Sequence, residues 1–185
     1  MLVVTEPEKL PVHEAKAGDP AAWDVLFRRY QLPLYVYVFE LVRNEQTSLD
    51  LVQESFIAAA KHIASLRDDS RFGSWLFGIA HQKCVQLWRA SRRVDVPLEE
   101  IPELPTELDD TPDEMLVHQE AEEEVLALLE RLPVEQRAAL LLHCVEGFSL
   151  QEIAEIAGVP AGTVKSRLHN AKRTMRKLLE RHEDT

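Results

Sequence analysis

The sequence predicts an all-α protein, with two small helical domains joined by an acidic linker. Apolar residues recur three and four positions apart in both halves, which is the spacing of one face of an α-helix. The acidic excess is confined to the middle, where residues 95–130 contain 14 Asp and Glu but no Lys or Arg. The flanks are nearly balanced, with 12 basic and 11 acidic residues in 1–94, and 9 basic and 7 acidic residues in 131–185. Such segregation is typical of separate modules with different partners.

The first domain is predicted over residues 14–94 as a bundle of helices. Asp19 and Pro20 mark the start of its first helix, because Asp is a favoured N-cap and Pro fits the first helical turn. Pro33 is expected to open a second helix. Apolar periodicity places two further helices over residues 48–66 and 72–93. No segment here alternates like a β-strand, which favours a helical bundle.

The linker is predicted over residues 95–112, where four prolines lie among acidic residues. That composition resists packing into a core. The second domain is predicted over residues 113–182. It begins with helices over 113–132 and 134–146, which Pro133 separates.

A helix-turn-helix is the sharpest local signal in the second domain. Ser149 and Glu152 have the spacing of a capping box at the start of a short helix, and Gly158 is the expected residue at its C-terminal end. A longer helix is expected over 161–181, with seven Lys and Arg against one Glu. In such a motif the start of the second helix reads base edges, and later cations contact phosphates. The alternative is an ordinary surface helix with a solvated basic face.

The motifs of both domains resemble a known family. Residues 147–154 and 158–168, which contain the helix-turn-helix, are similar to region four of the extracytoplasmic-function (ECF) group of sigma-70 family RNA polymerase sigma factors. Region two of that family is similar to three segments of the first domain, which are residues 18–23, 50–56 and 72–80. The motifs follow the order of the family and cover nearly all of the chain except the first dozen or so residues and the linker.

This resemblance implies that the chain directs core RNA polymerase to promoter DNA, with each domain reading one promoter element. The residues implied at the minus-thirty-five element are Thr163, Lys165, Ser166, Arg167, Asn170, Lys172 and Arg173. Those implied at the melted minus-ten element are Arg71, Phe72, Trp75, Gln82, Arg89, Arg92 and Arg93. Aromatic and Arg side chains can stack on an unpaired base, although an aromatic residue at helical spacing is equally typical of a core. Gln82 and Asn170 replace the usual Asn and Arg of the family, which implies a changed promoter preference.

The resemblance also implies that the third helix binds the polymerase. The residues implied in this contact are Asp50, Gln53, Glu54 and Phe56. Thr47 and Ser48 stand where the family usually carries acids, which implies weaker polymerase binding, or a helix-capping role for Ser48. We also predict that a Ser/Thr kinase modifies Thr47 or Ser48, because a phosphate would restore negative charge at the start of the helix.

Two other functions stay open on the sequence alone. One is a decoy that binds an anti-sigma factor without directing transcription, and the other is a regulator that acts without polymerase. The basic recognition helix argues against the first, and the motif at 50–56 argues against the second. An anti-sigma factor is also a candidate partner of a functional sigma factor. The acidic linker is implied to enter basic channels of the polymerase, or it is a solvated spacer.

Several classes of protein are not indicated. His81 with Cys84 and His143 with Cys144 lack the four-ligand spacing of a zinc site. No glycine-rich nucleotide motif is present, so we expect no cofactor and no enzyme. No apolar run approaches the roughly 20 residues of a membrane span, and the N-terminus does not resemble a signal peptide, so we expect a cytoplasmic protein without membrane insertion.

Both cysteines are expected to be buried free thiols.

Overall fold

The computed structural model describes residues 10–94 and 127–183, with side chains described within 10–90 and 127–179, and contains no strand in these ranges. The helices of the first domain are α1 (Val12–Lys16), α2 (Pro20–Val42), α3 (Glu45–His62) and α4 (Phe72–Val94). Two short 3-10 turns, Ile63–Ser65 and Asp69–Arg71, connect α3 to α4. Those of the second domain are α6 (Val134–Cys144), α7 (Leu150–Ala157) and α8 (Ala161–Glu183). The predicted all-α class is confirmed for the described residues.

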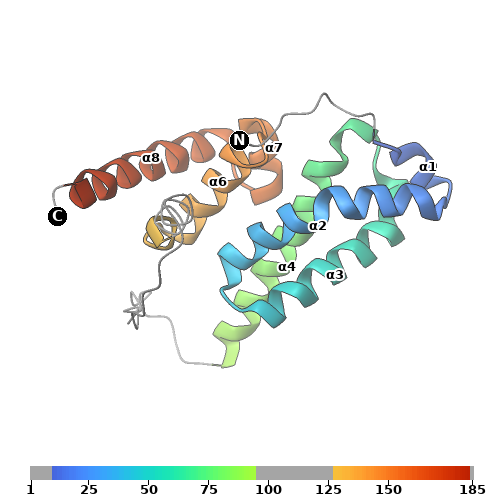
Figure 1. Ribbon diagram of the computed structural model, residues 1–185, viewed down its shortest axis with the longest axis horizontal. Helices are drawn as coiled ribbons and strands as arrows, with labels where there is room; N and C mark the ends of the chain where they lie inside the picture. Colours follow the sequence, from blue (N-terminus) through green and yellow to red (C-terminus); the bar gives the residue numbers. More distant parts are fainter. Residues whose placement is uncertain (1–9, 95–126, 184–185) are drawn as a thin grey trace, which may run out of the picture.

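The helices α2, α3 and α4 form the bundle of the first domain (Figure 1). Its core contains Leu26, Leu34 and Val38 of α2, which are fully buried at helical spacing. The predicted cap is confirmed, because Oδ1 of Asp19 accepts a hydrogen bond from the Ala21 N–H at 2.9 Å. The short α1 packs against α2 and the turn after α3.

The predicted helix boundary at Pro33 is wrong, since α2 runs through it to Val42. A proline inside a helix removes one backbone hydrogen bond and bends the chain, but it does not have to end the helix. Leu26 and Leu34 are completely buried on either side of Pro33. Burial of apolar residues on both sides therefore outweighs the local cost. The helix ends at Arg43, which adopts a left-handed conformation with φ of 55°.

The start of the third helix also differs from the prediction. α3 begins at Glu45 and is capped by Asn44, whose Oδ1 accepts a hydrogen bond from the Thr47 N–H at 2.9 Å. Ser48 is not the cap. It is fully buried one turn into the helix, and its hydroxyl donates to the Asn44 carbonyl at 2.7 Å.

The predicted helix-turn-helix is confirmed in detail. Ser149 and Glu152 form a reciprocal capping box at the start of α7, and Gly158 ends the helix in a left-handed conformation with φ of 65°. The chain then turns through Pro160 into α8, which is the long terminal helix in Figure 1. Ile153 and Ala154 are buried on α7, so the short helix packs tightly against its neighbours.

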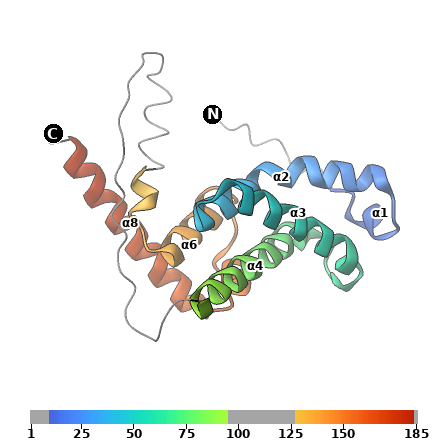
Figure 2. The same cartoon turned by 90° about the horizontal axis from the view of Figure 1, so that it is seen from below.

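The two domains pack against each other rather than standing apart (Figure 2). α7 lies on α4, and α6 lies on α2. Phe148, from the turn before α7, contacts the buried ring of Phe77 in α4, with ring centroids 5.3 Å apart. The buried residues of both domains consequently form one continuous core.

The cysteine prediction is half right. Cys84 is free and buried in α4, and burial raises the pKa of its thiol to about 12. Cys144 is free but exposed, and it is the last residue of α6. The predicted linker, 95–112, and the predicted start of the second domain, 113–126, lie outside the described residues.

Candidate nucleic-acid interface

The helix α8 has an apolar side that packs inside the second domain and a basic side that faces outward. Val164, Leu168 and Ala171 are buried at intervals of four and three residues. The opposite side carries most of the residues predicted to bind the minus-thirty-five element. Lys165, Ser166, Lys172 and Arg173 are exposed there, and Thr163, Arg167 and Asn170 are partly exposed. The capping box and the glycine turn fix this helix relative to α7, so its first turns are presented on a rigid support.

A cavity of about 450 Å³ lies beside the loop that leads into α4. Of the residues predicted at the minus-ten element, Arg71, Trp75 and Gln82 line it. The segment Leu66–Phe72, which the family resemblance implies would shape a pocket for the unpaired base, contributes Asp68 to the same wall, and Ile79 of α4 also lines it. The cavity therefore combines a partly exposed indole ring, a guanidinium and a side-chain amide, which are groups that can stack on and hydrogen-bond to a nucleobase.

Phe72 was predicted to contact the minus-ten element, but it is completely buried. Its ring packs against Trp23, Tyr30 and Trp75, with centroid distances of 6.3, 5.6 and 6.0 Å. Phe72 thus offers no surface to DNA in this arrangement. Phe72 packs against the ring of Trp75, and of these two side chains Trp75 lines the cavity.

The opposite wall of this cavity comes from the second domain. Glu152, Glu155 and Ile156 of α7 line it, and the guanidinium of Arg71 forms an ion pair with the carboxylate of Glu155. The first helix of the helix-turn-helix therefore covers the residues predicted to receive the minus-ten element. Arg71 and Glu155 are 84 positions apart in the sequence, and no local pattern connects them.

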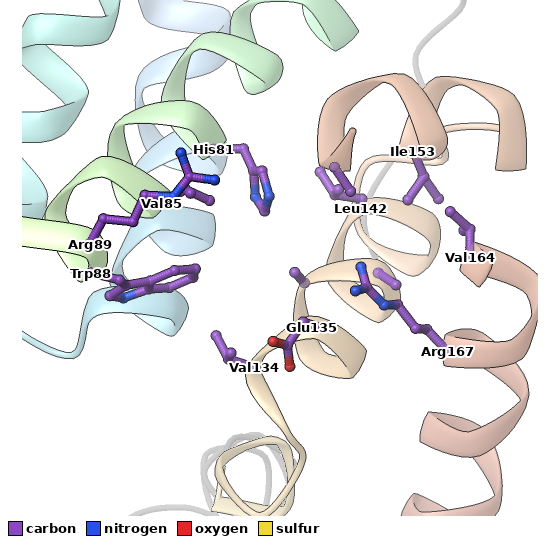
Figure 3. A pocket seen from close by; sticks show the side chains of 13 residues that line it. His81, Val85, Trp88, Arg89, Val134, Glu135, Leu142, Ile153, Val164 and Arg167 are labelled. Carbon is purple, nitrogen blue, oxygen red and sulfur yellow. The ribbon is translucent and has the colours of Figure 1, made fainter. Parts of the chain in front are cut away.

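A second cavity, of about 230 Å³, lies between α4 and the second domain (Figure 3). His81 and Trp88 of α4 face Arg167 of α8 across it, and the exposed Arg89 also lines it. Burial lowers the pKa of His81, and the nearby charge of Arg167 lowers it further. Nδ1 of His81 lies 2.8 Å from the hydroxyl of Tyr37. Burial raises the pKa of Tyr37 well above its usual value, so a protonated phenol shares this hydrogen bond with a neutral imidazole, whose tautomer decides which group donates.

A partly buried network of hydrogen bonds and ion pairs links the two domains where α2 meets α6. The guanidinium of Arg137 donates to the carbonyl of Glu40 at 2.6 Å and to the carbonyls of Glu130 and Leu132 at 3.0 and 3.1 Å. Arg43 forms ion pairs with the carboxylates of Glu40 and Glu130. Burial raises the pKa of Glu40, and Arg43 partly opposes this effect. These bonds fix the end of α2 to the start of α6.

The residues predicted to bind polymerase divide into an exposed group and a buried one. Asp50, Gln53 and Glu54 are exposed on the outer side of α3, and Lys83 of α4 donates to Glu54 at 2.8 Å. Phe56 is buried and packs on Phe27, with ring centroids 4.8 Å apart. The large exposed apolar residues of this helix, which the sequence did not single out for binding, are Leu49 and Ile57, each 47% exposed.

Some predicted features are not described by the structure. Arg92 and Arg93 lie in the last turn of α4, outside the residues with described side chains. Among the described residues, no group of three or more His, Cys, Asp or Glu is placed to hold a metal ion. No helix within the described ranges is long and apolar enough to cross a membrane.

Comparison with protein families identifies both domains. The model of sigma-70 region 2 matches residues 26–94, and the model of sigma-70 region 4 matches residues 122–175. The RNA polymerase sigma-H factor of Pseudomonas aeruginosa is 31% identical, and the alignment covers 97% of each chain. The ECF RNA polymerase sigma factor SigM of Mycobacterium tuberculosis is 32% identical over 95% of this chain and 85% of that protein.

Solved structures share the fold. CnrH, in complex with the cytosolic domain of CnrY, gives a TM-score of 0.66 at 22% identity, covering 95% of this chain and 98% of that one. The sigma factor RpoE of Bartonella quintana, in complex with the anti-sigma factor NepR, gives 0.62 at 24% identity over 84% of this chain and 96% of that one. From the two matched regions and from relatives more than 30% identical over nearly their whole length, we conclude that the chain belongs to the ECF group of sigma-70 family RNA polymerase sigma factors.

Proposed function

We propose that this protein directs core RNA polymerase to promoters by using three separate surfaces. The exposed side of α3 binds the polymerase, the cavity beside α4 receives the melted minus-ten element, and α8 reads the minus-thirty-five element. The observation that carries the proposal is the cavity lined by Arg71, Trp75 and Gln82, since it joins stacking and hydrogen-bonding groups in one place. The protein acts in the cytoplasm by binding, without chemistry of its own.

At the minus-ten element, an unpaired base enters this cavity. The indole of Trp75 offers a stacking surface, and the amide of Gln82 offers both a donor and an acceptor for base edges. Arg71 neutralises a phosphate next to the base, while Arg89, Arg92 and Arg93 contact phosphates of the upstream duplex. Phe72 supports Trp75 without touching DNA.

DNA can enter only if α7 leaves the cavity, because Glu152 and Glu155 form its opposite wall. Arg71 then exchanges the carboxylate of Glu155 for a DNA phosphate. Both side chains of this ion pair are about half exposed, at 40% and 48%, and such pairs contribute little to stability. Breaking this ion pair therefore costs little, but separating the domains also breaks the contact of Phe148 with Phe77 and the bond from Arg137 to Glu40. We propose that docking of the two domains on separate parts of the polymerase offsets that cost.

At the minus-thirty-five element, the first turns of α8 enter the major groove. Thr163, Lys165, Ser166, Arg167 and Asn170 lie where base edges are read, and Lys172 and Arg173 follow on the same helix to contact phosphates. Lys165 and Ser166 are already exposed in the closed arrangement. Arg167, which lines the cavity facing α4, becomes available when the domains separate.

At the polymerase, Asp50, Gln53 and Glu54 supply an acidic and polar surface on α3. Phe56 acts indirectly, because its buried ring holds the helix in place. Thr47 is a candidate site for a Ser/Thr kinase, since it lies partly exposed in the first turn of α3. Ser48 is less suited, because its hydroxyl is buried. The acidic linker occupies basic channels of the polymerase, and an anti-sigma factor holds the closed form.

The direct test is run-off transcription from a genomic fragment library, with core polymerase in the presence and absence of the protein. We expect new transcripts that start downstream of one shared pair of sequence elements. Transcription that is the same with and without the protein would contradict the proposal and would favour a decoy that only binds an anti-sigma factor.

A further inference from the structure

The side chain of Lys16 connects α1 to the loop that leads into α4. Its ammonium donates to the carbonyl of Leu66 at 2.6 Å and forms an ion pair with the carboxylate of Asp69. The two acceptors lie three residues apart, on either side of the bend in the loop. A single cation thus restrains two points of a segment that has no regular helix between them.

Lys16 extends from a fixed base. Val12 and Ala15 of α1 are 1% and 2% exposed, so the short helix is anchored in the core of the first domain. The indole N–H of Trp23 donates to the carbonyl of Ala15 at 3.2 Å, directly before Lys16. The position of the Lys16 backbone is therefore set by packing.

The loop that Lys16 holds is one wall of the cavity proposed to receive the minus-ten base. Leu66, Arg67, Asp68 and Arg71 all line that cavity. The carboxylate of Asp68 accepts hydrogen bonds from the N–H and hydroxyl of Ser70 at 3.0 and 2.7 Å, which stabilises the local turn. These bonds hold the turn together but do not attach it to the rest of the domain.

We propose that Lys16 is a positioning residue for minus-ten recognition, holding the loop Leu66–Arg71 in the shape that accepts an unpaired base. The inference rests on the proposed function of the cavity. α1, the loop and α4 all belong to the first domain, so the bonds of Lys16 persist when α7 leaves and Arg71 loses Glu155. Lys16 itself does not line the cavity, so it acts on the base only through the loop.

The test uses the complete holoenzyme and single-stranded non-template oligonucleotides that carry either the preferred minus-ten base or a replacement. In Lys16→Met the aliphatic stem remains but both bonds are lost. We expect discrimination between the two bases to fall by about tenfold, with core polymerase affinity and minus-thirty-five duplex binding unchanged. Lys16→Arg keeps a cation with several donors and should restore discrimination. Arg28→Met, which breaks the exposed ion pair with Asp24 within α2, is the matched control and should behave as wild type.

A second variant guards against a fold defect in Lys16→Met. Asp69→Asn keeps the bond from Lys16 to the Leu66 carbonyl but removes the ion pair, so it should lose part of the discrimination while its thermal unfolding stays close to wild type. Unchanged discrimination in Lys16→Met, or in Asp69→Asn if Lys16→Met does not fold, would show that Lys16 is only a surface ion-pair partner. If the wild-type holoenzyme does not distinguish the bases at all, the proposed function of the cavity fails, and the role of Lys16 fails with it.

Discussion

Arg71, at the entrance to α4, forms an ion pair with Glu155 of α7, and this contact places an acidic helix over the cavity that we assign to the minus-ten element. The carboxylate occupies the position next to Arg71 that a DNA phosphate would need. In the closed protein, the positive charge of Arg71 is therefore balanced by Glu155 of the second domain. Under the proposed function, DNA and α7 would compete for the same guanidinium.

This competition predicts what happens when the negative charge of Glu155 is removed. Glu155→Gln should raise the affinity of the free protein for a single-stranded minus-ten oligonucleotide, because Arg71 loses its anionic partner. The gain should shrink as salt is added, since it depends on a phosphate contact. Fluorescence anisotropy at low and high salt measures it.

The control for this variant has to remove an equal charge elsewhere. Glu14→Gln does so on the exposed side of α1, and it should raise the affinity much less. If both variants gain affinity equally, net charge explains the effect, and the Arg71–Glu155 contact does not restrict access to the cavity.

A second prediction concerns the close approach of α4 to α2. A Cβ atom added at Gly73 would lie 2.8 Å from the hydroxyl oxygen of Tyr30 and 3.2 Å from its ring. Gly73→Ala should therefore lower the free energy of unfolding by about 1–3 kcal/mol, as expected for overpacking, although alanine is the better helix former. Gly78 lies in the same helix with no atom within 4 Å of its added Cβ.

Gly78→Ala is consequently the matched control in chemical denaturation. It should raise the free energy of unfolding by about 0.5–1 kcal/mol, the ordinary preference of a helix for alanine. Two variants that shift stability in the same direction would contradict the packing of α4 on Tyr30.

A third prediction follows from the buried imidazole of His81. Its pKa is lowered by burial and by Arg167, so the unfolded chain, with a His pKa of about 6.5, takes up the proton first as the pH falls. The contribution of His81 to stability is thus present above about pH 6.5 and is lost below it. Between about pH 7.5 and 5.5, wild type should lose more stability than His81→Gln, whose amide oxygen can still accept from Tyr37.

The difference between the two proteins is the relevant quantity in this urea-denaturation experiment. Burial raises the pKa values of Glu40 and Glu146, which changes stability with pH in the opposite direction, but these groups are present in both proteins and cancel. Identical pH dependence in wild type and His81→Gln would mean that His81 is not held neutral between the domains.

A fourth prediction concerns modification of α3. A phosphate on Thr47 would lie in the first helical turn, where negative charge is favoured, and next to the surface of Asp50 and Glu54. Phosphorylated Thr47 should bind core polymerase more tightly than Thr47→Ala, and Thr47→Glu should bind with intermediate strength. Kinase treatment followed by mass spectrometry should find phosphate on Thr47 and none on the buried Ser48. If the phosphorylated, unmodified and substituted forms all bind polymerase equally tightly, Thr47 has no role beyond its place in the first turn of α3.

Local patterns in the sequence were enough to predict the helix-turn-helix, but not every helix boundary. The capping box of Ser149 and Glu152 and the left-handed Gly158 involve residues within one or two turns, so their spacing determines their contacts. The same reasoning failed at Pro33, where tertiary burial of Leu26 and Leu34 decides the outcome. It failed again at Ser48, because Asn44 is the better-placed cap.

The candidate site was only partly predictable for a related reason. Arg71, Trp75 and Gln82 lie within a few turns of each other on the loop and α4, so a local motif could locate them. Burial of Phe72 depends on Trp23 and Tyr30 from another helix, and the wall formed by Glu155 depends on the packing of two domains. Contacts between distant segments leave no periodic signal in the sequence.

Permanganate reactivity of thymines in the minus-ten region of a promoter selected by run-off transcription tests the roles of the cavity and of α8 most directly. Holoenzyme with the wild-type protein should make those thymines reactive, whereas core polymerase alone should not. Trp75→Ala and Gln82→Ala should bind the duplex but melt little of it. Lys165→Ala and Arg167→Ala should weaken duplex binding by roughly 1–3 kcal/mol and melt the DNA normally once bound. Wild-type reactivity in all four variants, or no reactivity above core polymerase alone, would contradict the assignment of these surfaces.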